Sequence, residues 1–336
     1  MVRAELDVSE RFVDTHDGWS LHLRRTVSPA HLDASTPPLL IVPGYGMNSF
    51  IFSYHPRKTS MERWLAEAGF EVWAMNLRSQ GDSRSRGRSP GAVSLASYAD
   101  VDLPAALACV QAASRTNGGG GVTLIGCSLG GTVVYSYLAL RGGAGVANVI
   151  TMGAPLVWKD VHPLLRVAFA SPALAGAISF SGTRSLVSRS LPLLLRAPSL
   201  LSLYMNTQTI DVEHMGEMTR TVEDPDASVN REIAHWIRAR DLTVRGVNVT
   251  RALAEVALPL FVVLSNRDGI VPETVAMSAR HAWGGPDVEV LRVGSDENWY
   301  AHANLFIAND APTLVFEPMI RWLNARRPPP DAPPRA

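Results

Sequence analysis

Apolar and polar positions follow two different periods along this chain. From Leu6 to Thr26 they alternate, with a turn at Asp17-Gly18, which predicts a pair of antiparallel strands. Beyond this pair, short apolar runs alternate with longer helix-like stretches. Such alternation predicts a parallel sheet covered by helices on both faces. The predicted strands are 39–42, 71–77, 122–127, 146–152, 260–264 and 288–293, and the predicted helices are 61–68, 95–113, 129–140, 273–283 and 312–323.

The strand and helix alternation stops between residues 156 and 250. This stretch contains helix-like apolar segments broken by Ser, Pro and Gly, and no convincing strand pattern. We interpret it as a helical cap inserted into an α/β core made of residues 1–155 and 251–326. Residues 327–336 are rich in proline and are predicted to be a disordered tail.

Charge and cysteine content exclude several classes of partner. The chain has 31 basic and 31 acidic residues, so it has no overall field to attract nucleic acid. Its apolar runs are too broken for a transmembrane helix. Cys109 and Cys127 lack the spacing of a disulfide framework or a zinc site, and the first residues lack a secretory pattern. We therefore expect a cytoplasmic protein without a metal or other cofactor.

The segment 126–130 reads Gly-Cys-Ser-Leu-Gly and lies directly between a predicted strand and a predicted helix. In that setting a G-x-S-x-G pattern forms a sharp turn that exposes the serine at the carboxyl edge of the sheet. An ordinary structural Gly-Ser turn is the alternative interpretation. The strand–helix context favours Ser128 as a nucleophile.

A serine nucleophile needs a base and an acid that orients this base. The loops after the last two predicted strands supply Asp268 and His302, respectively, at the same edge as Ser128. Asp268 could instead cap the following helix. Asp160 is the alternative acid, and His281, inside a predicted helix, is the weaker candidate base. We predict the set Ser128, Asp268 and His302.

Acyl transfer also needs two backbone N–H groups aimed at the oxyanion. The residue after the nucleophile, Leu129, should supply one. The turn at residues 43–46 follows a predicted strand and contains two glycines, so its backbone can approach the site closely. Tyr45 is the predicted second donor, although an ordinary tight turn would have the same sequence.

With these residues assigned, nearly the whole chain resembles the α/β-hydrolase family. Residues 43–46 resemble the family's His-Gly oxyanion loop, residues 76–83 its Asp-x-Arg-Gly-x-Gly-x-Ser loop, and residues 126–130 its nucleophile turn. Three positions depart from the pattern, namely Pro43 for His, Asn76 for Asp and Ser79 for Gly. The resemblance implies an α/β-hydrolase fold, with a mostly parallel sheet and an inserted helical cap.

Within the family, residues 50–78 and 302–323 resemble acid-lipase-like and polyhydroxyalkanoate-synthase-like members, which act on esters or thioesters of apolar acyl groups. Synthase-like relatives usually carry Cys at the nucleophile position, where this chain has Ser128. That difference favours hydrolysis over polymerisation.

The expected activity is hydrolysis of a small-molecule carboxylic ester through an acyl-enzyme. Acyl transfer or thioester cleavage by the same intermediate is the alternative, and a non-catalytic ligand-binding homologue is the third hypothesis. The apolar cap is also compatible with contact at a lipid interface. The sequence does not specify the oligomeric state. Candidate acyl-pocket residues in the cap are Leu164, Leu165, Val167, Phe169, 191–195, 200–201, Leu203 and Tyr204, although packing within the protein is the favoured explanation for most of them.

Overall fold

A mostly parallel nine-stranded sheet organises the protein, as shown by a computed structural model that describes residues 4–116, 120–177, 182–194 and 201–327. The strand order is β1-β2-β4-β3-β6-β7-β10-β11, and β5 pairs with β2. Pairs that involve β2 are antiparallel, and the others are parallel. The strands are β1 (Asp7–Asp14), β2 (Trp19–Val27), β3 (Leu39–Val42), β4 (Val72–Met75), β5 (Arg84–Ser85), β6 (Val122–Cys127), β7 (Val146–Met152), β10 (Leu260–Ser265) and β11 (Val288–Val293).

The burial of a strand's side chains depends on its place in the sheet. The central strands β3, β4, β6 and β10 are buried at every position, as expected for short apolar strands covered on both faces. The edge strand β1 is mostly exposed and carries charged residues, which blunt pairing with another chain. The predicted antiparallel pair and the predicted α/β-hydrolase fold are both confirmed.

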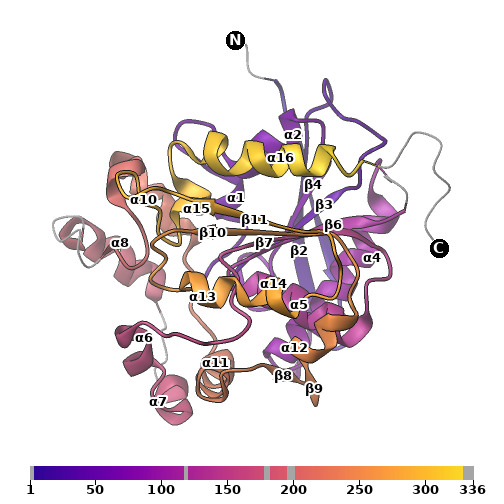
Figure 1. Cartoon of the computed structure of the whole chain (residues 1–336). Helices are drawn as coiled ribbons and strands as arrows, with labels where there is room; N and C mark the ends of the chain where they lie inside the picture. The colour runs from indigo at the N-terminus through magenta and orange to yellow at the C-terminus, as the bar shows by residue number, and fades with distance from the viewer. Residues whose placement is uncertain (1–3, 117–119, 178–181, 195–200, 328–336) are drawn as a thin grey trace.

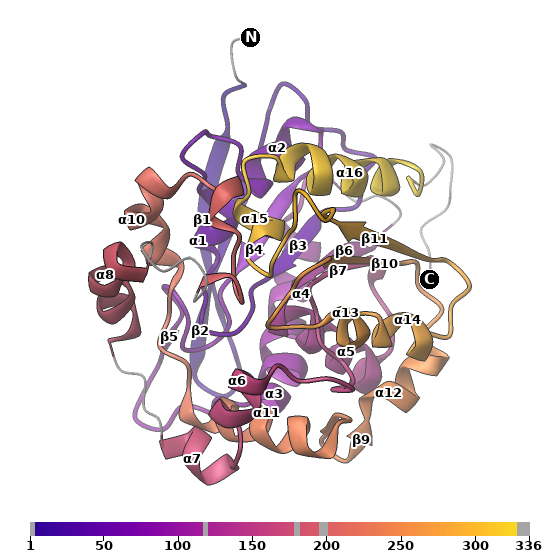
Figure 2. The same cartoon turned by 60° about the vertical axis from the view of Figure 1, so that its left-hand side comes forward.

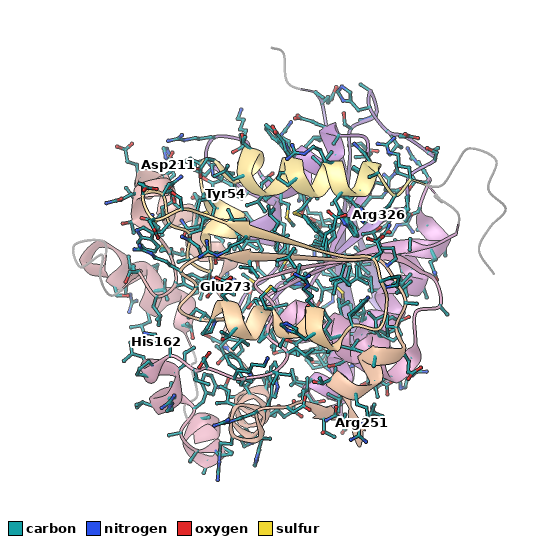
Figure 3. All side chains as sticks on the ribbon, viewed as in Figure 1. Tyr54, His162, Asp211, Arg251, Glu273 and Arg326 are labelled. Carbon is teal, nitrogen blue, oxygen red and sulfur yellow. The ribbon has the colours of Figure 1, made fainter. Side chains whose placement is uncertain are left out.

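Helices cover both faces of the sheet (Figure 1). In both views α2 and α16 lie together over one face, whereas α5, α12, α13 and α14 lie over the other (Figure 2). Arg326, just after α16, pairs with Asp287, which precedes β11, and with Glu289 in β11, and so ties this helix to the sheet (Figure 3). The core helices are α1 (Phe50–Ser53), α2 (Met61–Glu67), α3 (Leu95–Ser97), α4 (Leu103–Ala113), α5 (Leu129–Arg141), α12 (Val249–Ala252), α13 (Glu273–Ala276), α14 (Ser278–Ala282), α15 (Asn304–Ile307) and α16 (Glu317–Asn324).

Three predicted helices are interrupted, and one of them, 312–323, begins with a π-helical segment, Pro312–Phe316, before α16. The stretch 95–113 passes through a π-helical turn, Tyr98–Asp102, between α3 and α4. The stretch 273–283 divides into α13 and α14. Apolar periodicity is nearly the same on both sides of such a break, so the sequence pattern did not reveal it.

Residues 156–250 are mainly helical, with α6 (Pro163–Ala168), α7 (Pro172–Ala177), α8 (Thr183–Leu194), α10 (Met215–Met218) and α11 (Ala227–Ala239). The expectation of no strand in this stretch was wrong. β8 (Thr243–Val244) and β9 (Val247–Asn248) form a hairpin, and its two turn residues, Arg245 and Gly246, both have positive φ. Strands of two residues are too short to produce a recognisable period. Within the described ranges, no helix is long and apolar enough to cross a membrane. Most of the predicted tail, residues 328–336, lies outside the described residues.

Candidate active site

Ser128 lies on the turn between β6 and α5, in a backbone conformation that side chains rarely adopt, with φ 53° and ψ −125°. Such a conformation costs about 1–3 kcal/mol and persists only where the surrounding structure enforces it. The close packing of the turn provides that enforcement. A Cβ on Gly130 would lie 2.2 Å from the carbonyl oxygen of Val42, and one on Gly126 would lie 2.4 Å from the Cα of Gly131. The glycines are therefore required by the approach of neighbouring backbone.

Ser128, His302 and Asp268 form a continuous hydrogen-bonded chain. His302 Nε2 lies 2.9 Å from Ser128 Oγ, and His302 Nδ1 lies 2.6 Å from Asp268 Oδ2. All three residues are less than a tenth exposed. The Asp268 carboxylate can only accept a hydrogen bond, so His302 Nδ1 carries the ring proton and donates it in a hydrogen bond to Asp268. The lone pair of Nε2 then faces the serine hydroxyl. The three predicted residues thus lie together, with His302 between Ser128 and Asp268.

The other carboxylate oxygen of Asp268 also accepts hydrogen bonds. Asp268 Oδ1 accepts hydrogen bonds from the backbone N–H groups of Ile270 and Val271, each at 2.8 Å. These bonds fix the orientation of the carboxylate, so that only Oδ2 faces His302. Asp268 therefore orders its own turn while contacting the histidine, and it does not cap α13, whose N-cap residue is Pro272.

The loop that carries His302 is held by a segment that sequence reasoning did not connect with it. Ala303 N–H donates to the carbonyl of Tyr204, and the buried Asn304 amide makes four hydrogen bonds. Its oxygen accepts from the N–H groups of Asn206 and Ala301, and its nitrogen donates to Asn206 O and Thr209 Oγ1. Nearly a hundred residues separate the two segments. No local sequence signal pairs them.

The two predicted oxyanion donors lie beside Ser128. Leu129 is the first residue of α5, where backbone N–H groups have no partner within the helix. The turn at residues 43–46 packs directly on the serine, since a Cβ on Gly44 would lie 2.7 Å from Ser128 Cβ. The Tyr45 hydroxyl donates to Asn230 Oδ1 of α11, and burial raises the pKa of Tyr45. This places Tyr45 and Leu129 at the same cavity as the serine.

This cavity, which we name the serine cavity, has a volume of about 180 Å³ and mostly apolar walls. The predicted residues Leu165, Phe169 and Tyr204 line it, whereas Leu164 and Val167 point away and are 62% and 74% exposed. The side chains of residues 191–200 lie outside the described set. The lining residues are Tyr45, Met47, Ser128, Leu129, Pro155, Trp158, Leu165, Phe169, Tyr204, Ile233, Trp236, Ile237, Ile270, Val271 and His302.

Comparison with known families gives a match to the alpha/beta hydrolase fold over residues 37–293, which is more than half of the chain. The chain belongs to this family. A comparison with curated proteins gives no significant match.

Solved structures of esterases share the fold at low sequence identity. An esterase from Rhodococcus sp. ECU1013 is 19% identical, with a TM-score of 0.60, and the match covers 94% of this chain and 99% of that one. A thermophilic esterase from Thermogutta terrifontis is 16% identical, with a TM-score of 0.63 and coverage of 95% and 100%. An esterase from Exiguobacterium antarcticum is 17% identical, with a TM-score of 0.57 and coverage of 94% and 100%.

Two of the three departures from the family pattern have structural explanations, and nothing in the structure explains Pro43 at the position of the family's His. At the family's Asp position, Asn76 accepts from Ser49 N–H through Oδ1, and its Nδ2 lies 3.0 Å from His22 Nδ1. An amide can accept and donate at once, as these two neighbours require. Ser79, at a family glycine position, has φ 65° and so retains the left-handed backbone that glycine would adopt. Arg78, which precedes Ser79 and matches the family's Arg, is fully buried and pairs with Asp102 and Asp17.

The alternative candidates lie elsewhere. The Asp160 carboxylate is exposed and accepts a hydrogen bond from Thr274, and His281 lies on α14. Cys127 is buried beside Met152, and burial raises the pKa of its thiol. His162 caps the short helix α6 at the surface (Figure 3). Within the described ranges, no group of three or more His, Cys, Asp or Glu side chains is placed to hold a metal ion.

Proposed function

We propose that this chain is a serine hydrolase that cleaves carboxylic esters with an apolar acyl group. The observation that carries the proposal is the hydrogen-bonded chain from Ser128 through His302 to Asp268, which opens on an apolar cavity. The family match and the esterase structures support the same reaction class.

In the proposed reaction, Ser128 Oγ attacks the ester carbonyl carbon while His302 Nε2 takes the hydroxyl proton. Asp268 stays ionised and stabilises the imidazolium that forms. The backbone N–H groups of Leu129 and Tyr45 stabilise the negative oxygen of the tetrahedral intermediate. His302 then protonates the leaving alcohol, which gives an acyl group on Ser128. Water attacks this acyl-enzyme while His302 takes a proton from it, and His302 then returns a proton to Ser128 Oγ as the carboxylic acid leaves.

We also propose that residues 156–250 form a cap over this site. Support comes from the lining of the serine cavity, because α11 contributes Ile233, Trp236 and Ile237, and Leu165 and Phe169 come from α6 and its end. These apolar side chains would surround the acyl group and exclude bulk water from it.

Labelling with a fluorophosphonate probe tests the proposed nucleophile. The wild-type protein should label covalently, and Ser128→Ala should not. A matched control is Ser136→Ala, because Ser136 is also buried, on α5, and does not line the cavity. Failure of the wild type to label, or equal labelling of Ser128→Ala, would refute the proposal. Product analysis with added alcohol then shows whether free acid or a new ester is released.

A further inference from the structure

The helix α11 separates the serine cavity from a second cavity. The second one, which we name the outer cavity, has a volume of about 300 Å³ and is lined by residues of α11, by Leu95 and by the β8–β9 hairpin. Of the residues that the structure places around these two cavities, Trp236 alone lines both. Its indole therefore forms the wall between them.

The helical periodicity of α11 explains this position. Successive residues of an α-helix are rotated by about 100° around its axis. From Trp236, this rotation puts Ile233 and Ile237 on one side and Glu232 and Ala239 on the other. The first two line the serine cavity, and the last two line the outer cavity. Trp236 lies on the strip of the helix surface between the two sets.

The indole wall is held in a single orientation. Trp236 is 3% exposed, and its Nε1–H donates to the carbonyl oxygen of Leu156 at 3.0 Å. Its ring also packs edge-to-face on Trp158, with 5.5 Å between ring centroids. Trp158 itself lines the serine cavity. A ring fixed by a hydrogen bond and by aromatic packing does not swing aside easily, so the wall is a steric limit.

Volume sets the size of the group that this limit admits. A cavity of about 150 Å³ holds benzene, so the serine cavity of about 180 Å³ holds roughly six carbons. The outer cavity would more than double the available volume if the wall were removed. Resting on the proposed ester hydrolysis, we propose that Trp236 is the residue that determines acyl-chain length, and that the substrates are esters of short apolar acids or of benzoic acid.

A chain-length series of p-nitrophenyl esters, from acetate to palmitate, tests this assignment. In the wild type, kcat/KM should be highest at about six carbons or fewer and should fall by about tenfold or more for dodecanoate. Trp236→Ala should move the optimum to longer chains, because the acyl group then extends into the outer cavity. Trp236→Phe should keep the wild-type profile. Trp236→Leu gives a second open variant if Trp236→Ala does not fold.

Two further variants separate a removed wall from general loosening of the cavity. Ile237→Ala enlarges the serine cavity only by its own side chain and should not admit dodecanoate. Ala239 is exposed and lines only the outer cavity, so Ala239→Trp should leave the wild-type profile unchanged. The same change in Trp236→Ala should abolish the gain in long-chain activity.

The outcomes distinguish this inference from the proposed function. If the wild type does not label with fluorophosphonate, the proposed function fails. If it labels on Ser128 but already prefers dodecanoate, or if neither open variant shifts the profile, only the role of Trp236 is refuted. Equal shifts in Ile237→Ala and Trp236→Ala would also refute that role.

Discussion

Substitution of Asp268 by Asn tests whether the carboxylate sets the tautomer of His302. In the wild type, Oδ1 accepts from the N–H groups of Ile270 and Val271, and Oδ2 accepts from His302 Nδ1. An asparagine at this position has a single oxygen, and two N–H donors hold it on their side. Its NH₂ group must then face His302.

This arrangement should exchange the donor and acceptor roles of the two His302 ring nitrogens. An NH₂ group donates, so Nδ1 would become an acceptor and the ring proton would move to Nε2. Nε2 lies 2.9 Å from Ser128 Oγ and could then no longer take the serine proton. The equivalent change in serine proteases lowers kcat by about 10⁴-fold, which corresponds to about 5 kcal/mol of transition-state stabilisation. We expect a loss of that order.

The assay is kcat/KM on p-nitrophenyl butyrate, together with urea unfolding. Asp268→Asn should retain near wild-type stability, because both backbone N–H groups keep an acceptor. Asp268→Ala should lose comparable activity and also be less stable, since each unpaired N–H costs about 1–3 kcal/mol. A folded Asp268→Asn protein with activity within about tenfold of wild type would refute this reasoning.

Three further predictions concern the stability of the scaffold. Gly130→Ala should fail to fold or should unfold at a much lower temperature, because the new Cβ would meet the backbone of Val42. Gly216→Ala is the control and should keep the wild-type melting temperature, because open space surrounds Gly216. Equal melting temperatures of the two variants would contradict this prediction. Asn304→Asp removes the two buried hydrogen bonds that the amide nitrogen donates, and it should reduce the free energy of unfolding in urea by about 1–3 kcal/mol. An unchanged free energy of unfolding would show that these bonds do not hold the loop that carries His302. Burial lowers the pKa of His55, so His55 should stabilise the fold above its ordinary pKa of about 6.5 and lose this contribution as pH falls below it. The melting temperature should therefore drop less on acidification in His55→Asn than in the wild type, and an equal drop would contradict it.

The sequence by itself determined eight of the nine strands of the sheet and the position of the candidate nucleophile, whereas the two-residue strand β5 was too short to show a pattern. Both follow from local properties, because a short apolar run between turn residues forms a buried strand, and a serine between close glycines forms a sharp turn. The loops with Asp268 and His302 could be assigned because each follows a predicted parallel strand, and the carboxyl ends of such strands share one edge of the sheet.

Only the tertiary structure decided which side chains meet and what surrounds them. Ser128 and His302 are 174 residues apart, and nothing local in the sequence specifies the 2.9 Å contact between them. The Asn304 contacts with Asn206 likewise depend on how the cap segment returns to the core. The position of Trp236 between two cavities depends on where α11 packs. Helical periodicity gives the face of each residue, whereas long-range packing decides what that face meets.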